Sequence, residues 1–519
     1  MPSHVSRYWR AETLVFLGLW LTMMTAGRSG FFKDPGSLWH TAVGQRMLAS
    51  GHLIHTDSFS FTAQGKAWMP QSWLAECILA LIHRMSGLDG ILLATVTLLA
   101  CLYTWVFRRL IRAGVHPLLA VFLLALTLLA STYHIYVRPH LLTLAFLGWT
   151  FAKLCDFETG RISLARLFWL LPLFVLWANV HGGMIAGLGT VTIAVAGWTI
   201  AFWLRWDGPL VRFKQILWLS LLVIGCGLAA FVNPYGAALP RVWLSLIGSP
   251  VIPHEIREHL PLLDCGPWVI FIVSLLGFVY VTALIGVLPA RPRVTWLIPL
   301  VWLALTWTRI RHGPLFAITV VIALADMFPH VRWTRWLAAN GSVLFRLQEC
   351  RKLEAWKGLD WRSILAPSVL VLTTLVFQIG SYSVPLLGRN WAQLDRSLLP
   401  LELLPELREL ERSAPGGTPI FNDMLFGGFL IYYTPGLRVF IDDRCELYGD
   451  KGLCDYVQAL RDNPAQIEAW ADQYGFESAL IRTDSAFDHY FQRASGWSMV
   501  RRTEAATLYQ RSLKIVQRD

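Results

Sequence analysis

Carboxylates that could do acid–base chemistry stand just after the first long apolar stretch of the sequence. Asp34 follows that stretch directly, and Asp57 lies in the polar segment 51–73. A carboxylate at a membrane boundary can act as general base towards a hydroxyl group, while an aromatic side chain such as Trp39 packs on a lipid or a sugar. The alternative is structural, with Asp34 capping a helix start at Pro35 and Asp57 capping a turn.

Four further polar motifs stand at the ends of apolar stretches, namely 136–140, 177–183, 233–236 and 309–312. Guanidinium groups match phosphate oxygens in pairs, so the arginines and the histidine of these motifs predict a site for phosphate or pyrophosphate. The substrate-binding candidates are Trp39, His40, Arg138, His140, Asn179, His181, Arg309, Arg311 and His312. The alternative for each histidine is contact with lipid headgroups. The Asn233–Gly236 motif is a turn signal, and we interpret its side chains as structural.

The composition of the chain indicates what kind of elements carry these motifs. The chain has 519 residues, of which 55% are hydrophobic and only 15% are charged, with 25 Trp and a mean hydropathy of +0.48. Soluble proteins of this size are far less apolar. The net charge of +11 comes from short clusters between apolar stretches rather than from one basic patch, so it indicates membrane topology and no nucleic-acid partner.

Eleven stretches approach the length of a membrane-spanning helix. They lie near 11–29, 88–107, 116–134, 139–156, 166–183, 184–204, 215–232, 267–289, 294–308, 313–329 and 363–384. Trp73–Met85 is too short to cross and contains His83 and Arg84, so we expect an interfacial helix. If Trp73–Met85 does not cross the membrane, the basic clusters of the membrane loops lie mainly on one side, which the positive-inside rule assigns to the cytoplasm.

This topology predicts a multi-pass inner-membrane protein with a cytoplasmic N-terminus, a transmembrane domain over 1–384 and a long first outer loop over 30–87. Residues 385–519 would form a small periplasmic α/β domain. Its predicted strands are 419–421, 429–433, 438–442, 479–481 and 507–510, with a helix near 463–474. The first apolar stretch lacks a cleavage site and is expected to stay as an anchor.

Several common chemistries have no motif here. The sequence contains no HExxH, P-loop, GxSxG or dinucleotide-binding fingerprint. Its His, Cys, Asp and Glu residues show no metal-ligand spacing, so no cofactor is indicated, although a divalent cation is compatible with the sequence.

The order of these features resembles the GT-C superfamily of integral-membrane glycosyltransferases, and most closely a largely uncharacterised bacterial branch of it. The resemblance rests on one N-terminal span, a long outer loop that opens with Asp34, an interfacial helix, many spans and an outer C-terminal domain. It is carried by the segments 34–73, 138–140, 177–183, 233–236, 309–312, 427–430 and 439–444, which together reach over nearly the whole chain.

The resemblance implies an inverting, hexosyltransferase-like enzyme that transfers a sugar from a polyprenyl-phosphate carrier to an acceptor on the outer face. The acceptor would be a lipid, a glycan or a protein. The family places its base in the first outer loop, and Asp34 matches that position. Many members carry an acidic pair there, whereas this chain has Asp34-Pro35, so Asp57 is the fallback base. The arginines at 138, 309 and 311 would bind the carrier phosphate, by the anion argument above.

Two other functions fit parts of the sequence. A transporter or flippase for a lipid-linked sugar would do no chemistry, and we would expect internal repeats and polar groups at mid-membrane. The sequence has no clear repeat, and its polar motifs stand at helix ends, which favours the enzyme. A ligase that transfers a whole glycan would belong to the same class of outer-face transfer.

Overall fold

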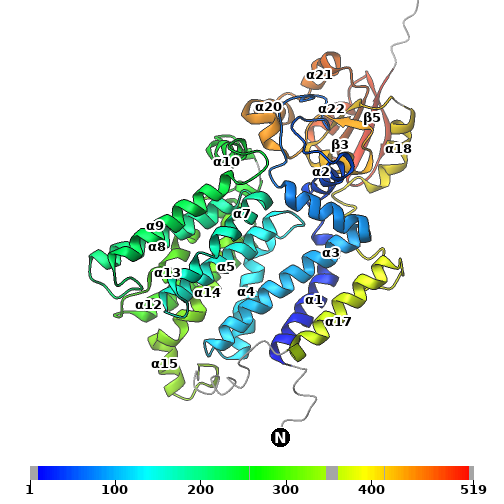
Figure 1. The fold of residues 1–519 in the computed structure, drawn as a ribbon. Coiled ribbons are helices and arrows are strands. Elements are labelled where there is room, and N and C mark those ends of the chain that lie inside the picture. The colour runs from blue at the N-terminus through cyan, green and yellow to red at the C-terminus, as the bar shows by residue number, and fades with distance from the viewer. Residues whose placement is uncertain (1–9, 256, 346–360, 414, 513–519) are drawn as a thin grey trace, which may run out of the picture.

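The computed structural model describes residues 10–255, 257–345, 361–413 and 415–512. Residues 11–379 form mainly a bundle of helices, and the C-terminal residues form a small domain at one end of that bundle (Figure 1). We call this end of the bundle the domain end and the other the opposite end. Helix α1, which begins at Ala11, starts at the opposite end (Figure 1).

Each predicted span coincides with a helix. The helices are α1 (Ala11–Gly30), α3 (Trp73–Arg112), α4 (Pro117–Ser131), α5 (His140–Glu158), α7 (Leu170–Val180), α8 (Met184–Trp203), α9 (Phe213–Leu228), α12 (Pro267–Val287), α13 (Val294–Thr308), α14 (Gly313–Met327) and α17 (Trp361–Ile379). Within the described ranges, six helical segments are long and apolar enough to cross a membrane by length and composition. The predicted polytopic helical architecture is confirmed.

Helix α3 changes direction at Gly87, whose φ of 65° and ψ of −151° are not helical. Its first part is the segment that the sequence predicted as an interfacial helix. Helix α2 (Gly36–Ser50) packs against that part so closely that a Cβ on Gly44 would lie 2.0 Å from the backbone oxygen of Glu76. The glycine therefore allows α2 to sit on α3 at the domain end of the bundle.

The most buried helix is α14, which packs against α4, α5 and α13 and whose residues from Phe316 to Met327 are all buried. Short helices connect the long ones: α6 (Leu164–Leu167), α10 (Ala238–Gly248), α11 (Ile252–Glu255) and α15 (Arg332–Ala339). The 3-10 turns are η2 (Thr132–His134), η3 (Ala229–Phe231), η4 (Arg257–His259), η5 (Leu262–Asp264), η6 (Ile310–His312), η7 (Phe328–His330), η8 (Val343–Phe345) and η10 (Leu401–Leu403).

The C-terminal domain is built on a five-stranded sheet with the order β2-β1-β3-β5-β4. Its strands are β1 (Thr418–Asn422), β2 (Leu437–Val439), β3 (Ser478–Arg482), β4 (Trp497–Arg502) and β5 (Ala506–Arg511). The β2, β1 and β3 strands are parallel, and β5 and β4 pair antiparallel. The helices are α18 (Leu404–Ser413), α19 (Met424–Tyr433), α20 (Cys445–Arg461), α21 (Gln466–Tyr474) and α22 (Ala486–Phe491). The predicted α/β class is confirmed.

The predicted strand at 429–433 is wrong, because these residues belong to helix α19. Asp423 caps this helix by accepting a hydrogen bond from the amide of Leu425 at 3.1 Å. Helix α19 packs against both β2 and α2, so its residues are apolar on all sides and show no helical periodicity. The strand predicted at 438–442 is also shorter, since β2 ends at Val439. Strand β4 was not predicted.

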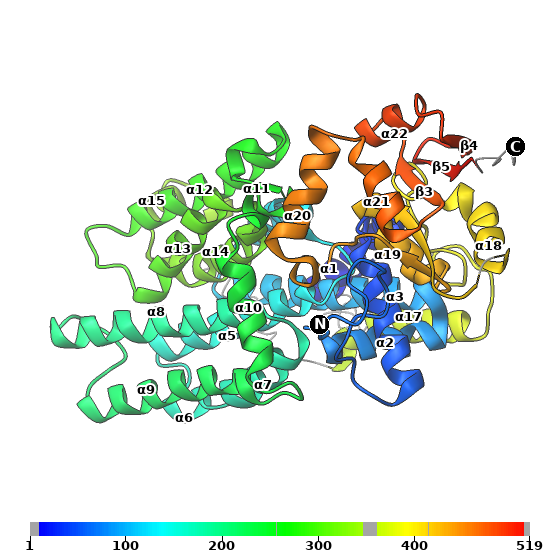
Figure 2. The same cartoon turned by 90° about the horizontal axis from the view of Figure 1, so that it is seen from above.

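The first long loop joins the C-terminal domain to the bundle. The amide of Val439 in β2 donates to Phe59 at 3.1 Å, and the amide of Phe61 donates back to Val439 at 3.0 Å. The loop thus covers the outer edge of the sheet. Seen from above, the domain lies over α1, α2, α3 and α17, while α8, α9, α12 and α13 extend to the other side (Figure 2).

Candidate active site

Asp34 lies between α1 and α2 at the domain end of the bundle. Its Oδ1 accepts a hydrogen bond from the amide of Gly36 at 2.7 Å, so the carboxylate does cap the start of α2. The same Oδ1 lies 2.6 Å from Nε of Arg138, an ion pair whose N–H is not aligned as a hydrogen bond. A Cβ on Gly36 would lie 2.4 Å from that Nε, so the glycine makes room for the guanidinium. The two interpretations of Asp34, cap and reactive carboxylate, are therefore compatible.

Arg138 contacts three carboxylates from three separate parts of the chain. Besides Asp34, its guanidinium donates to Glu258 in η4 at 3.2 Å and to Asp443, which follows β2. The four side chains keep between 12% and 19% of their surface exposed. We call Asp34, Arg138, Glu258 and Asp443 the carboxylate cluster. It lies where the bundle, the 249–264 loop and the C-terminal domain meet.

The carboxylate cluster holds more negative charge than one guanidinium can balance in a buried place. Burial raises the pKa of Asp34 to about 6 and that of Asp443 to about 7, although Arg138 acts in the opposite direction on both. Burial also opposes ionisation of Glu258, but Arg138 and His134 outweigh it and hold the pKa of Glu258 well below its usual range. Near neutral pH the cluster can therefore both accept and release a proton.

Three imidazoles stand beside this cluster. The rings of His134 and His140 lie 4.3 Å apart between centroids, and those of His140 and His181 lie 6.4 Å apart. Nδ1 of His181 is 2.9 Å from the hydroxyl of Thr143, which also accepts a hydrogen bond from Trp177 at 2.8 Å. The ring of His140 contacts the carbonyl of His134 at 2.6 Å. The structure thus brings the motifs at 136–140 and 177–183 together.

Arg311 belongs to η6, between the end of α13 and the start of α14. It lies 2.5 Å from Nε2 of His259 and has no carboxylate within ion-pair distance among the described residues. Arg309 and His312 flank it, and the ring of His312 contacts the carbonyl of Leu305 at 3.1 Å. Unlike Arg138, Arg311 therefore makes no direct ion pair with a described carboxylate, although Glu258 of the carboxylate cluster lies near enough to act on its charge.

Trp39 and His40 stand in the first turns of α2. Their rings stack with centroids 3.7 Å apart. Nδ1 of His40 lies 2.8 Å from Oε1 of Glu76 at the start of α3. Glu76 is fully buried, and its Oε2 has no hydrogen-bond partner in the part of the chain that the structure describes. Trp39 and His40 lie on the same face of α2 as Gly36, one turn further along the helix.

Asp57 lies in a different environment from Asp34. Its carboxylate accepts hydrogen bonds from the amides of Phe59 and Ser60, from the hydroxyl of Ser60 and from the guanidinium of Arg444 at 2.7 Å. Arg444 also pairs with Asp442, and the side chains of Asp57, Arg444 and Asp442 have no exposed surface. Burial opposes ionisation of Asp57, but Arg444 and Ser60 outweigh it and lower the pKa. This buried ion pair holds the first long loop to the C-terminal domain.

The amide of Asn179 is also fully used. It accepts from the ring nitrogen of Trp73 at 3.0 Å and donates to the carbonyls of Val175 and Val232 at 2.8 Å each. These contacts join α7 to the start of α3 and to the turn after η3. The predicted turn at Asn233–Gly236 is present, with the amide of Tyr235 donating to Asn233 at 2.8 Å.

Sequence reasoning did not select Glu258 or Glu76 as site residues. For Asp442-Asp443 the sequence allows contact with the acceptor or a salt-bridged strand end, and the second interpretation is favoured there. Asp443 stands between two residues of the Asp57 ion pair, yet its own side chain points into the carboxylate cluster. A tandem of acidic residues at the end of a strand was the available signal. Glu258 stands in a loop without a distinctive motif, so only the fold could find it.

The described residues include no group of three His, Cys, Asp or Glu side chains placed as metal ligands. The carboxylates that do converge are already paired with Arg138, so the site does not fit a resident metal at that position. A divalent cation stays a prediction.

The comparisons with known proteins bear on the fold. No family model matches the sequence, and no curated protein matches it. The structure is similar to the oligosaccharyltransferase of Archaeoglobus fulgidus tethered with an acceptor peptide, with a TM-score of 0.54 and 12% identity, over 91% of this chain and 69% of that one. It also matches ArnT from Cupriavidus metallidurans bound to undecaprenyl phosphate, with a TM-score of 0.49 and 12% identity, over 96% and 98% of the two chains. ArnT in the apo state matches with a TM-score of 0.48 and 13% identity over 96% and 97%.

The likeness to the oligosaccharyltransferase defines the class of fold. This chain has the fold of that oligosaccharyltransferase, with a bundle of helices of which several are long and apolar enough to cross a membrane, and a small C-terminal α/β domain. The fold predicted from the sequence is thereby confirmed.

Proposed function

We propose that this chain is a membrane glycosyltransferase that moves a sugar from a polyprenyl-phosphate carrier to an acceptor on the outer face of the membrane. The observation that carries the proposal is the carboxylate cluster, in which three segments of a GT-C fold bring carboxylates to one buried arginine. Such a crowded, partly protonated site costs stability and is typical of a place where chemistry occurs. The resemblance of the sequence to the GT-C superfamily supplies the class of reaction, which is sugar transfer from a polyprenyl-phosphate carrier.

Asp34 is the base in this proposal. It stands in the first long loop, where the family resemblance places the base, and a pKa of about 6 leaves it ionised and still basic near neutral pH. It would accept the proton of the acceptor hydroxyl while the acceptor oxygen bonds to the anomeric carbon. The bond from that carbon to the carrier phosphate breaks on the opposite face, and the phosphate leaves with the electron pair. The configuration at the sugar is thereby inverted.

We assign Asp57 a structural role, because all its hydrogen bonds are already made inside a buried ion pair. A carboxylate that accepts four hydrogen bonds and carries a lowered pKa is a poor proton acceptor. Arg138 is likewise occupied, so it positions Asp34 in this proposal and does not itself bind phosphate.

Arg311 is the proposed anchor for the carrier phosphate, with Arg309 beside it. Arg311 and Glu258 influence each other electrostatically, which places the phosphate site next to the carboxylate cluster in this proposal. A guanidinium without a carboxylate partner can stabilise the charge that develops on the leaving phosphate. Trp39, His40, His140 and His181 would line the space between phosphate and acceptor.

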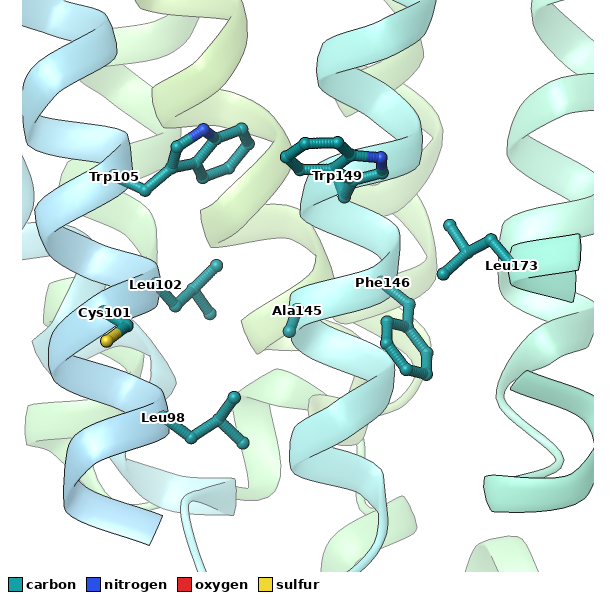
Figure 3. Close-up of a pocket in the computed structure, with 8 residues that line it drawn as sticks. All are labelled: Leu98, Cys101, Leu102, Trp105, Ala145, Phe146, Trp149 and Leu173. Atoms are coloured by element: carbon teal, nitrogen blue, oxygen red, sulfur yellow. The ribbon is translucent and has the colours of Figure 1, made fainter. Parts of the chain in front are cut away.

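The carrier also has a long apolar chain that must stay in the membrane. A groove of about 340 Å³ opens between α3, α5 and α7, and its side chains are shown in Figure 3. On α5, the first residue that lines the groove is Ala145, about one turn after His140. We propose that the apolar chain lies in this groove, which is lined by Leu98, Cys101, Leu102, Trp105, Ala145, Phe146, Trp149 and Leu173.

The domain end faces the periplasm in this proposal. The start of α1 and basic helix ends such as Arg109, Arg293 and Arg332 lie at the opposite end, as the positive-inside rule expects for the cytoplasmic side. A lipid-linked donor cannot leave the bilayer, so a site at helix ends meets both the carrier and a water-borne or membrane-borne acceptor.

The test of the class is sugar transfer by purified protein from a panel of polyprenyl-phosphate sugars, with carrier movement across liposome leaflets measured in parallel. Transfer or release of the sugar supports the enzyme. Movement of the intact carrier, with no turnover of any donor, would replace the enzyme with the transporter. An Asp264→Asn variant, which changes an exposed carboxylate in the 249–264 loop, is the control and should behave as wild type.

A further inference from the structure

A second polar feature lies at the opposite end of the bundle, far from the carboxylate cluster, where α15 packs on the end of α12 (Figure 1). The ring nitrogen of Trp333 donates to the carbonyl of Thr282 at 3.3 Å, and a Cβ on Gly286 would lie 2.5 Å from that nitrogen. Arg332 donates to the carbonyl of Leu288 at 3.3 Å. These contacts fix the short helix against the turn that connects α12 and α13.

The side chains of α15 form an open groove of about 570 Å³, lined by Arg332, Trp333, Arg335 and Trp336. Trp336 is 63% exposed although it is a large apolar residue. Arg332 and Arg335 are exposed, and neither has a carboxylate partner among the described residues. The groove therefore offers two free guanidinium groups beside an indole ring.

The neighbouring turn adds two more arginines. Arg291 stacks over the ring of Trp206 at 4.8 Å, and Arg293 stacks over Trp296 at 4.9 Å. Neither of them has a carboxylate partner in the part of the chain that the structure describes. We call Arg291, Arg293, Arg332 and Arg335, together with Trp336, the α15 basic site.

Three acidic residues close to this end are used elsewhere, and one of them, Glu158, accepts hydrogen bonds from the amides of Val294 and Thr295 at 2.8 and 2.9 Å. Asp156 and Asp326 each pair with both Arg109 and Arg161, which closes a compact four-residue ion-pair network between α3, α5 and α14. The two arginines and the two aspartates of this network together carry no net charge. Among the described residues no carboxylate lies within ion-pair distance of the α15 basic site, so its positive charge favours an anionic ligand.

We propose that the α15 basic site binds the phosphate headgroup of an anionic phospholipid in the leaflet on the N-terminal side of the membrane. Helices α12 and α13, which carry exposed Phe278, Ile285 and Leu297, continue from the site as an apolar surface. An anion that binds here next to lipid-facing helices would be a lipid. Arginine holds phosphate oxygens in pairs, and tryptophan favours the membrane interface. The proposal does not depend on the glycosyltransferase function.

The test uses the full-length protein in nanodiscs or detergent and counts bound lipids by native mass spectrometry, with phosphatidylglycerol and phosphatidylcholine offered in equal amounts. Wild type should retain phosphatidylglycerol selectively. The double variant Arg332→Gln with Arg335→Gln should bind it about 10- to 30-fold more weakly, since each basic residue near an anionic headgroup contributes roughly fivefold. Trp336→Ala, which keeps all four charges, should show a smaller loss.

The matched control is Arg408→Gln with Arg412→Gln on α18, which removes the same charge from exposed residues at the domain end. It should retain the lipid as wild type does. Equal retention by all variants would overturn the lipid site. So would an equal loss in the α15 and the α18 variants, because binding would then follow net charge alone. Size-exclusion profiles and thermal unfolding confirm that each variant is folded.

Discussion

Arg444 is the buried cation that joins the C-terminal domain to the first long loop, and its removal gives a sharp prediction. Its guanidinium donates to Asp57 at 2.7 Å and to Asp442 at 2.8 and 2.6 Å. Replacing Arg444 with Met would leave both carboxylates buried and unpaired. Breaking a buried pair in this way costs about 3–5 kcal/mol. In Arg444→Met the state in which the first long loop has separated from the C-terminal domain should therefore be more populated, by the factor that corresponds to this free energy.

The assay is amide hydrogen exchange of the full-length protein in detergent, followed by mass spectrometry. The reporting amides are those of Asp57, Phe61 and Val439, which bond across the loop and to β2. Since a factor of ten corresponds to about 1.4 kcal/mol, their exchange should accelerate about 100- to 4000-fold in Arg444→Met. The pKa of Asp57 is lowered in the folded state, so the stabilising effect is present above its ordinary pKa and is lost as the pH falls through the lowered value.

The control for this experiment is Arg461→Met. Arg461 pairs with Glu255 at 2.7 Å but is 61% exposed, so its loss should cost less than about 1 kcal/mol and change exchange by less than about tenfold. If Arg444→Met accelerated exchange no more than Arg461→Met does, the Arg444 ion pair would not hold the loop, and the structural role assigned to Asp57 would be wrong.

Three further predictions concern the carboxylate cluster and the neighbouring Arg311. The rate of sugar transfer should fall below about pH 6 as Asp34 is protonated, and Glu258→Gln should move this acid limb to lower pH, because it removes an ionised carboxylate that raises the pKa of Asp34; an unchanged limb in a pH–rate profile would contradict the assignment. Arg311→Gln should raise the KM for the donor about 10- to 100-fold, with a smaller effect on kcat, because it removes a charge-assisted bond to phosphate. Gly36→Ala should lower kcat about tenfold or more while the protein stays folded, because the new Cβ displaces Arg138 from Asp34; wild-type kinetics would mean that this contact is not needed.

The helical part of the fold could be predicted because membrane spans are long and uniformly apolar. The break in α3 was also predictable, since the polar His83 and Arg84 interrupt a span just before Gly87. The C-terminal domain was harder. The sequence of helix α19 favours a strand because its residues are apolar on every face of the helix and therefore show no helical period.

The candidate site was predictable only in part, because its members come from distant segments. Asp34 and Arg138 were both selected from their motifs, but as base and as phosphate ligand, and nothing in their spacing indicates that they touch. Glu258 lies 120 residues from Arg138 and Asp443 lies 305 residues away. Only tertiary packing shows that these charges share one buried place, and that Arg311 is left without an acidic partner.

The most direct test of the central claim is a single-turnover measurement of sugar transfer from a bound polyprenyl-phosphate sugar, comparing wild type with Asp34→Asn and Asp57→Asn. We predict that Asp34→Asn binds the donor with unchanged affinity and transfers the sugar about 100- to 10,000-fold more slowly, as expected for loss of a general base. Asp57→Asn should keep the chemical rate in whatever fraction of the protein is folded. Wild-type transfer by Asp34→Asn, or a loss confined to Asp57→Asn, would contradict the account.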